Sequence, residues 1–324
     1  MKAAWYEKQG PAREVLVVGE MPDPIPAAGE VRIRISASGI NPGDIKKREN
    51  AFSYGMPYPR VIPHSDGAGR VDQLGTGVPS EWIGRSVWCY GAQSYRPFGT
   101  AAEFTVVPVD QIAVLPESVP MQQGACLGIP GITAHRAVHV AGAVNGRIVL
   151  VQGAAGSVGV CAVHLARRAG ARVIGTVKSP SDEAAAKDAG AHEVLVSDGE
   201  LVSHVKAMAP DGVDHIVEVA FGANIEADVE LLRLGGSIAT YATDNAAPKI
   251  PVWQMVFKNI RLFFLGSDDF PKEAKLEAAR DLSAALGAGW AGFEIGEQVP
   301  LADIARAHEL AEHPVRRGRV VVVV

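Results

Sequence analysis

The sequence has few cysteines, and those it has lie far apart. Its 324 residues contain only Cys89, Cys126 and Cys161. An odd number of widely spaced cysteines provides neither a disulfide framework nor the close pairs that are typical of zinc sites. We therefore expect three buried free thiols in a cytoplasmic protein, because a reducing compartment keeps cysteines unpaired.

The sequence also lacks long apolar runs and an excess of positive charge. No apolar run approaches the roughly 20 residues of a membrane-spanning helix, and the first residues lack the apolar core of a secretory signal. The 36 acidic residues outnumber the 31 lysines and arginines, which gives a net charge of −5. A mildly acidic protein is a poor binder of nucleic acid or of an anionic membrane. We therefore expect no partner of either kind.

The sequence pattern changes near residue 123. Residues 1–122 are rich in proline and glycine and contain short β-like runs, which predicts a mainly β domain. Residues 123–267 alternate apolar strands with helices, which predicts an α/β fold with a Rossmann doubly wound parallel sheet. Residues 268–324 should return to the first domain, because six strands complete such a sheet. The six expected strands are 148–151, 172–177, 194–196, 214–219, 237–241 and 262–265.

A glycine-rich turn follows the first of these strands and opens a helix. This is the context that a dinucleotide-binding fingerprint requires, because unpaired backbone N–H groups at a helix start attract phosphate. Ala154 stands where the first glycine of the usual pattern would be, and a glycine turn used only for packing is the alternative. The expected pyrophosphate contacts are Gly153, Ala155, Gly156, Ser157, Val158 and Gly159.

The end of the second Rossmann strand predicts which dinucleotide binds. Enzymes that use NAD place a carboxylate about 20 residues beyond the glycine turn, to accept the ribose 2′-hydroxyl. Here Thr176 is followed by Lys178 and Ser179, which offer a cation and donors suited to a 2′-phosphate. The expected cofactor is therefore NADPH. A solvated loop lysine is the alternative for Lys178.

Later strands of the expected sheet add further candidate contacts. Ligands of such sheets bind at the carboxyl ends of parallel strands. Ala220 follows the fourth strand, Tyr241 ends the fifth, and Phe264 and Leu265 end the sixth. We expect all four to contact the cofactor.

Four ordered segments give the chain a family resemblance over nearly its whole length. They are the run Gly39–Asp44 with Arg48 beyond it, the run Pro63–Val71, the run Gly128–Ala134 and the glycine turn. In these the chain resembles the medium-chain dehydrogenase/reductase superfamily, and more closely its zinc-independent, zeta-crystallin-like quinone oxidoreductases. The resemblance implies a GroES-like catalytic domain over 1–122, a Rossmann NADPH-binding domain over 123–267, and a C-terminal segment, 268–324, that completes the catalytic domain.

The same resemblance predicts that no metal is bound. Zinc alcohol dehydrogenases of this superfamily carry a cysteine ligand where Asn41 stands, and Gly-His-Glu where this chain has His64, Ser65 and Asp66. The histidine is one position out of register. A catalytic zinc needs three protein ligands and an open position, and no such set is evident.

The resemblance also implies site residues outside the glycine turn. Asn41, Tyr54 and His64 are the candidate catalytic residues, and Asn41, Thr133 and Arg319 are further candidate cofactor contacts. Each has an alternative role: an amide that fixes a turn for Asn41, a surface side chain for Tyr54, a helix cap for Thr133 and a surface salt bridge for Arg319. For His64 the expected role is in the cleft, and there are two alternatives: a metal ligand and a purely structural histidine.

These observations predict NADPH-dependent reduction of a quinone or an activated enone by hydride transfer without zinc. A zinc-independent alcohol dehydrogenase or an enoyl-thioester reductase is one alternative, and a non-catalytic NADPH-binding or structural protein is another. The sixth strand, 261–265, would lie at a sheet edge and could pair with its twin. Relatives form dimers in this way, so we expect a homodimer.

Overall fold

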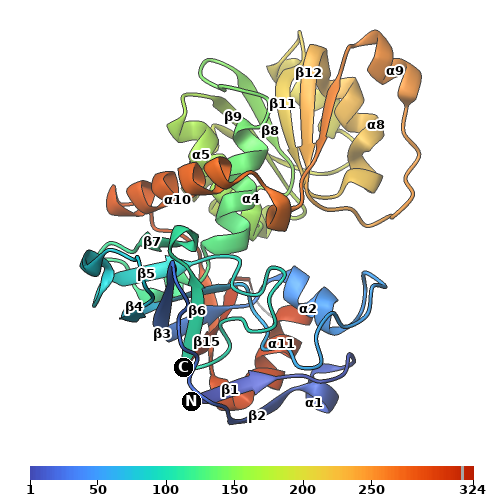
Figure 1. Cartoon of the computed structure of the whole chain (residues 1–324). Helices are drawn as coiled ribbons and strands as arrows, with labels where there is room; N and C mark the ends of the chain where they lie inside the picture. Colours follow the sequence, from blue (N-terminus) through green and yellow to red (C-terminus); the bar gives the residue numbers. More distant parts are fainter. Residues whose placement is uncertain (315–316) are drawn as a thin grey trace. The chain divides into compact units, whose positions relative to one another are not determined.

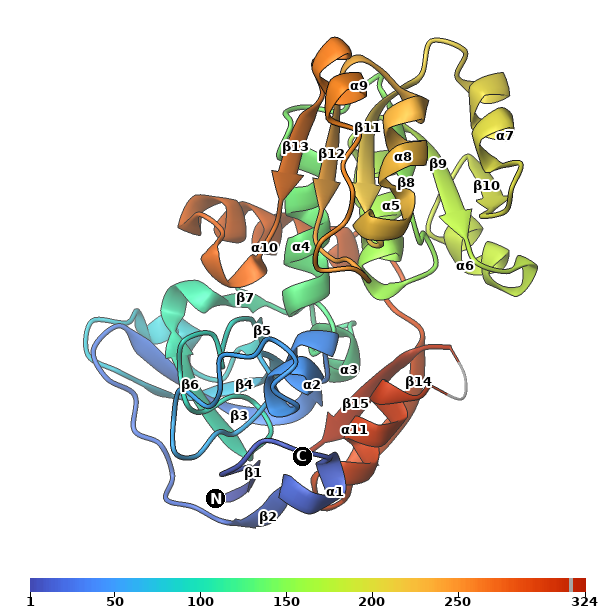
Figure 2. The same cartoon turned by 90° about the vertical axis from the view of Figure 1, so that its right-hand side faces the viewer.

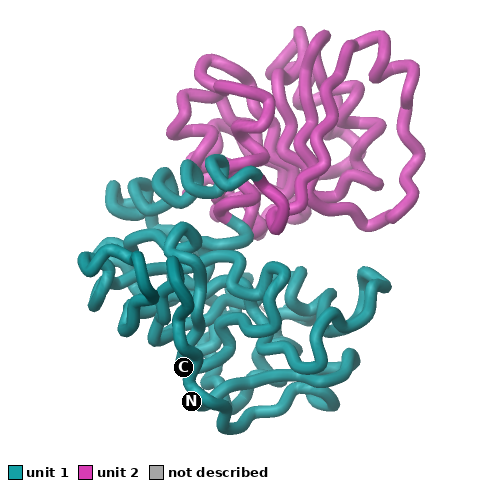
Figure 3. The backbone as a smooth tube through the Cα atoms, viewed as in Figure 1, with its two compact units in different colours: residues 1–130, 271–324 teal, residues 131–270 magenta. Residues whose placement is uncertain are grey.

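The computed structural model describes residues 1–314 and 317–324. The chain divides into two compact units, shown in Figure 3. Unit 1 comprises residues 1–130 and 271–324, and unit 2 comprises residues 131–270. The expected boundaries, at residues 122 and 267, lie slightly earlier in the chain.

Unit 1 contains a seven-stranded sheet that is mainly antiparallel (Figure 1). Its strand order is β14-β15-β3-β4-β5-β7, with β6 paired to β3. The C-terminal strand β15 pairs antiparallel with β3 through Val321–Gly39, so the last segment of the chain shares a sheet with the first. The strands of this unit are β1 (Lys2–Trp5), β2 (Val17–Glu20), β3 (Glu30–Gly39), β4 (Asp66–Leu74), β5 (Ser86–Cys89), β6 (Phe104–Pro108), β7 (Ile112–Val114), β14 (Ile295–Pro300) and β15 (Arg319–Val323).

The helices of unit 1 are mostly short. The short helix α2 places Asn41 at its N-cap, immediately after strand β3, and is therefore the one that matters most for the candidate site. The α-helices are α1 (Ala12–Val15), α2 (Pro42–Arg48), α3 (Met121–Gly124), α10 (Lys272–Gly287) and α11 (Ile304–Glu312). Helix α4 (Gly128–His139) crosses the boundary between the units.

Unit 2 is built on a six-stranded parallel sheet with the order β10-β9-β8-β11-β12-β13, visible edge to edge in Figure 2. This order confirms the predicted Rossmann topology. Leu150, Ile174, Ile216 and Ile238 are fully buried on four adjacent strands and form the centre of the core. The strands are β8 (Ile148–Val151), β9 (Arg172–Val177), β10 (Glu193–Val196), β11 (Val213–Glu218), β12 (Leu232–Thr240) and β13 (Arg261–Phe264); the helices are α5 (Ser157–Arg168), α6 (Glu183–Asp188), α7 (Leu201–Met208), α8 (Phe221–Leu231) and α9 (Val252–Phe257).

Two strands are longer than the sequence pattern predicts. Strand β12 begins at Leu232 rather than 237, because Leu232 pairs with Val213 before an irregularity in the register. Strand β3 continues to Gly39, beyond the β-like run at 31–35 in the sequence, because its last residues pair with both β4 and β15. Among the described helices, none combines the length and apolar character needed to cross a membrane.

Candidate functional site

The glycine turn between β8 and α5 has a conformation that only glycine adopts easily. Gly153 has a φ of +67°. A Cβ atom on Gly159 would lie 2.1 Å from the carbonyl oxygen of Gly153, which no larger residue could tolerate. Gly159 therefore makes its close approach to the turn itself.

The start of helix α5 is open to an anion. Gly156 is the N-cap, it is exposed, and an added Cβ there would meet only the Gly153 carbonyl oxygen, at 3.3 Å. Ala155, Ser157 and Val158 are partly exposed beside it. The first N–H groups of a helix lack partners within the helix and carry its positive dipole end. This geometry suits a phosphate group.

The end of strand β9 presents one cation and one carboxylate. Lys178 is exposed directly after the strand. The Ser179 hydroxyl lies 2.6 Å from the Ser181 hydroxyl and 3.1 Å from Asp182 Oδ2. Asp182 ends the short 3-10 helix Pro180–Asp182 that follows, and its carboxylate lies against Ser179. A negative charge there opposes the 2′-phosphate that Lys178 would attract.

Thr176 lies beneath the glycine turn. Its side chain is buried, and its hydroxyl accepts the Gly153 N–H at 3.2 Å and donates to Gln152 Oε1 at 2.6 Å. Ala154 N–H also donates to the Thr176 carbonyl, at 2.8 Å. Thr176 therefore supports the turn from below, and its hydroxyl is already engaged.

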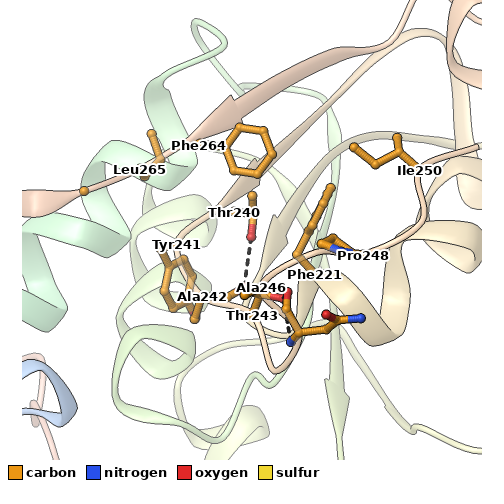
Figure 4. Close-up of a pocket in the computed structure, with 12 residues that line it drawn as sticks. Phe221, Thr240, Tyr241, Ala242, Thr243, Ala246, Pro248, Ile250, Phe264 and Leu265 are labelled. Carbon is orange, nitrogen blue, oxygen red and sulfur yellow. Dashed lines mark hydrogen bonds between the residues drawn. The ribbon is translucent and has the colours of Figure 1, made fainter. Parts of the chain in front are cut away.

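A cavity of about 480 Å³ lies at the carboxyl ends of β12 and β13 in unit 2 (Figure 4). Tyr241, Phe264 and Leu265, three of the expected cofactor contacts, line it. The rings of Phe221 and Phe264 meet edge to face with centroids 5.4 Å apart. Ala220, the fourth expected contact, is adjacent in sequence to Phe221, and its N–H donates to Glu218. The walls are mainly apolar, with hydroxyls from Thr240 and Thr243.

Asn41 is the centre of a buried polar cluster in unit 1. Its side-chain amide donates to Asp66 Oδ2 at 2.6 Å, and its side-chain oxygen accepts from Arg319 at 2.8 Å. Its backbone N–H donates to Asp44 at 2.8 Å. The residue therefore joins the start of α2 to β4 and β15, and the orientation of its amide is fixed at both ends.

Asp66 is fully buried and has an unusual pKa. Burial and the nearby Asp44 carboxylate raise the pKa of Asp66 to about 7, against the opposing effects of donors from Ile129 and Asn41 and of the Arg319 charge. Its Oδ2 accepts from the Ile129 N–H at 2.8 Å and from Asn41, whereas its Oδ1 has no donor among the described residues. An oxygen in this position is satisfied best by a proton of its own.

His64 lies in the interior of unit 1 with both ring nitrogens engaged. Nδ1 lies 2.7 Å from the Ser38 hydroxyl, and Nε2 lies 3.0 Å from Nε2 of His308. Burial, with a smaller effect of Arg319, lowers the pKa of His64 to about 3. The geometry favours the structural role among the three that the sequence left open. Both ring nitrogens already have partners within unit 1 and are not available to a substrate.

Three other candidates occupy definite environments. Arg319 is buried and bonds to Asn41, so the alternative of a surface salt bridge is wrong. Thr133 lies in the second turn of α4, which begins at Gly128, so the alternative of a helix cap is also wrong. Tyr54 is exposed and its ring stacks on Phe52 with centroids 5.6 Å apart, which leaves both of its possible roles open.

Sequence reasoning missed the polar groups that are buried behind the candidate site. Gln152, Glu218 and Asp228 are almost fully buried in unit 2, and His308 is fully buried in unit 1. Glu218 could have been suspected, because it is a carboxylate in the apolar run of a parallel strand. The positions of Asp228 and His308 within helices give no comparable signal.

The described residues contain no group of three or more histidine, cysteine, aspartate or glutamate side chains that could hold a metal ion. The three cysteines are buried and free. His64 faces Ser38 and His308, and the Asn41 side chain faces Asp66 and Arg319. Asn41, at the position of one zinc ligand, and His64, one residue away from the position of another, are thus committed to partners within unit 1.

Comparisons with known proteins agree with this architecture. Residues 27–117 match the family described as alcohol dehydrogenase GroES-like domain, and residues 157–279 match the family described as zinc-binding dehydrogenase. The chain is 34% identical over 293 residues to a mouse quinone oxidoreductase, which covers 88% of this chain and 86% of the relative.

Solved structures resemble the chain over its whole length. A mycobacterial quinone oxidoreductase has a TM-score of 0.89 at 26% identity, with full coverage of both chains. A second mycobacterial structure, complexed with NADPH, has a TM-score of 0.86 at 25% identity, again with full coverage of both. The chain therefore belongs to the quinone oxidoreductase family of the medium-chain dehydrogenase/reductase superfamily.

Proposed function

We propose that this protein reduces quinones or activated enones by hydride transfer from NADPH and that it uses no zinc. The observation that carries the proposal is the open glycine turn at the start of α5, with Lys178 exposed at the end of the neighbouring strand β9. The quinone oxidoreductase relatives and the NADPH complex of a structural neighbour support it.

The residues present fit a dinucleotide phosphate. Backbone N–H groups from Ser157 to Gly159 would hold the pyrophosphate, because nothing but the Gly153 carbonyl lies within contact of a Cβ on Gly156. Lys178 and Ser179 would hold the 2′-phosphate. The strand-end cavity offers apolar walls to a flat ring, with Tyr241, Phe264 and Leu265 among them. Bound NADPH would supply the hydride.

The described residues offer no set of metal ligands, and this limits the class of substrate that we propose. Oxidation of a simple alcohol is helped by a Lewis acid that stabilises the alkoxide, and the described residues offer no set of ligands for one. A quinone or an activated enone accepts hydride without such help, and its oxygen then gains negative charge. The amide nitrogen of Asn41 has a second hydrogen beyond the one given to Asp66, and we propose that it stabilises that oxygen.

The remaining site residues act around this centre in the proposal. We propose that Thr133 and Arg319 contact or position the cofactor and that Tyr54 contacts the substrate. His64 has a φ of +75° in the loop before β4, and its two buried side-chain hydrogen bonds would help to hold that loop. The expected cytoplasmic location stays a prediction.

Binding and turnover test the proposal separately. Calorimetry with NADPH should show saturable binding, and 1,2-naphthoquinone should be reduced at the expense of NADPH. Crotonyl thioesters and simple alcohols, assayed beside it, distinguish the two alternative enzyme functions. Binding without turnover of any substrate would favour a non-catalytic protein. The absence of binding to either reduced nicotinamide nucleotide would refute the proposal.

We also propose a homodimer that forms through strand β13. This strand is an edge of the unit 2 sheet, and unprotected edges invite pairing. Large apolar side chains lie exposed on it and on α9: Phe264 is 68%, Trp253 70% and Phe257 76% exposed. Light scattering should give the mass of a dimer, and Phe257→Asp should give a monomer. The matched control is Ile25→Asp, at an exposed apolar residue of unit 1.

A further inference from the structure

A buried polar network lies beneath the glycine turn in unit 2. Gln152 directly follows β8, Thr176 lies in β9, Glu218 ends β11 and Asp228 lies in α8. All four side chains are at most 2% exposed. Four elements therefore bring polar groups together in an interior that is otherwise apolar, and the turn that would bind pyrophosphate rests on this group.

The hydrogen bonds of the network run in a fixed direction. The Gly153 N–H donates to the Thr176 hydroxyl at 3.2 Å, and this hydroxyl donates to Gln152 Oε1 at 2.6 Å. Because its oxygen is used in this way, Gln152 must direct its amide nitrogen to Asp228 Oδ1, at 2.8 Å. The backbone of the turn is thereby connected to the Asp228 carboxyl group through two side chains.

The second oxygen of Asp228 requires a proton. Oδ2 has no donor among the described residues, and the group beside it is the carboxylate of Glu218. Glu218 accepts from the Ala220 N–H and, at 3.1 Å, from the Asn224 amide, so its negative charge is well stabilised. Two buried carboxylates in contact cannot both ionise without a large cost. The proton belongs on Asp228.

The charges that face this pair favour the same assignment. Burial and the Glu218 charge both raise the pKa of Asp228 well above its usual range, and the Gln152 donor opposes them only in part. Tyr241, the titratable group that faces Glu218 from the end of β12, has its own pKa raised by burial and by Glu218. It therefore stays neutral and does not add a second negative charge.

We propose that Asp228 and Glu218 share one proton at neutral pH and that Gln152 and Thr176 transmit this state to the glycine turn. In this arrangement Asp228 and Gln152 are positioning residues for the dinucleotide. The inference rests on the proposed binding of NADPH. Loss of the proton would place a second negative charge in the buried interior. It would disturb the support of the glycine turn and also of the turn at Ala220, because Glu218 accepts the Ala220 N–H.

An asparagine at position 228 is the sharpest test. A protonated aspartic acid offers one acceptor and one donor, and an asparagine amide offers the same pair to Gln152 and Glu218. We expect Asp228→Asn to bind NADPH within about twofold of wild type at pH 6.5, a difference below ~0.5 kcal/mol. From pH 6.5 to 9.5 wild-type affinity should fall further than that of the variant, which cannot lose the proton. Asp228→Leu and Gln152→Leu should each weaken NADPH about tenfold at pH 6.5, which is ~1.4 kcal/mol.

The measurements distinguish this inference from the proposed function. Affinity comes from calorimetry over the pH range, with Asp188→Asn as the control at an exposed aspartate of the same unit. Infrared spectra of the unliganded Asp66→Asn protein, which lacks the other aspartate of raised pKa, should show the carbonyl band of a buried protonated carboxylic acid that a further Asp228→Asn substitution removes. Wild-type protein that fails to bind NADPH would refute the proposed function, while the infrared band would still test the shared proton. An Asp228→Asn protein that unfolds or matches the pH dependence of wild type, or a double variant that keeps the band, would overturn the inference.

Discussion

Replacing Lys178 with alanine tests the basis of the expected preference for NADPH. Lys178 follows strand β9 directly and is exposed, and Ser179 and Asp182 lie beside it. The lysine cation is the feature that would favour a 2′-phosphate over a 2′-hydroxyl. We expect the substitution to weaken the binding of NADPH and to leave the binding of NADH almost unchanged.

The expected loss of NADPH binding free energy follows from the exposure of Lys178 to solvent. A charge-assisted contact with a phosphate contributes about 1.5–3 kcal/mol where it is protected from water, and exposed ion pairs contribute about 0.2–1 kcal/mol. An exposed lysine against a doubly charged phosphate should lie between these ranges, at about 1–2 kcal/mol. This corresponds to an increase of roughly 5- to 30-fold in the Kd for NADPH. Added salt should reduce the difference, because the contact faces solvent.

Calorimetric titration of both nucleotides provides the assay. Lys187→Ala is the matched control, because it removes the same charge from an exposed lysine of helix α6 that pairs with Glu183. Asp182→Asn should act in the opposite direction and tighten NADPH, since its carboxylate lies against Ser179. Equal losses for NADPH and NADH in Lys178→Ala would refute the reasoning, and so would a Lys187→Ala variant that behaves in the same way.

Three further predictions concern the buried groups of unit 1. Burial lowers the pKa of both His64 and His308, so the contribution of these two histidines to the free energy of unfolding should fall as the pH drops below about 6.5, where the unfolded chain binds their protons; urea titrations should show His308→Gln becoming more stable relative to wild type as the pH falls. The raised pKa of Asp66 gives stability that is lost as the pH rises from about 4 through 7, so over that range Asp66→Asn should become steadily more stable relative to wild type. Gly128→Ala would place a Cβ 2.0 Å from Asp66 Oδ1 and should cost about 1–3 kcal/mol of stability by urea titration, whereas Gly43→Ala, in open space on α2, should not destabilise the protein.

Much of the fold could be predicted because the Rossmann unit has a regular pattern. Apolar strands and helices alternate at a spacing that only a covered parallel sheet satisfies, and β8 and β9 begin and end where the sequence placed them. Gly190, with a φ of +107°, follows the C-cap of α6 in the left-handed conformation that glycine commonly adopts after a helix. The ends of β3 and β12 could not be predicted, because they are set by pairing with distant strands and not by local sequence.

Residues of the candidate site could be predicted only at positions where the backbone geometry allows a single residue type. Glycines at 153 and 159 are required by backbone geometry, and that requirement is visible in the sequence. The environment of His64 was not visible, because its partners Ser38 and His308 are 26 and 244 residues away in the chain. The environment of Arg319 was likewise not visible, since nothing local shows that it faces Asn41.

The buried histidines and aspartates act on stability in opposite directions over the same pH range. His64, His215 and His308 have lowered pKa values, so on folding each releases a proton that the unfolded chain would bind below about pH 6.5. Asp66 and Asp228 have raised pKa values, so each takes up a proton on folding above about pH 4. Between these values the two sets offset one another, and the net exchange of protons is smaller than either set alone would give. The free energy of unfolding should therefore change little across this range in the wild-type protein, and replacement of both aspartates by asparagine should make it rise steeply with pH.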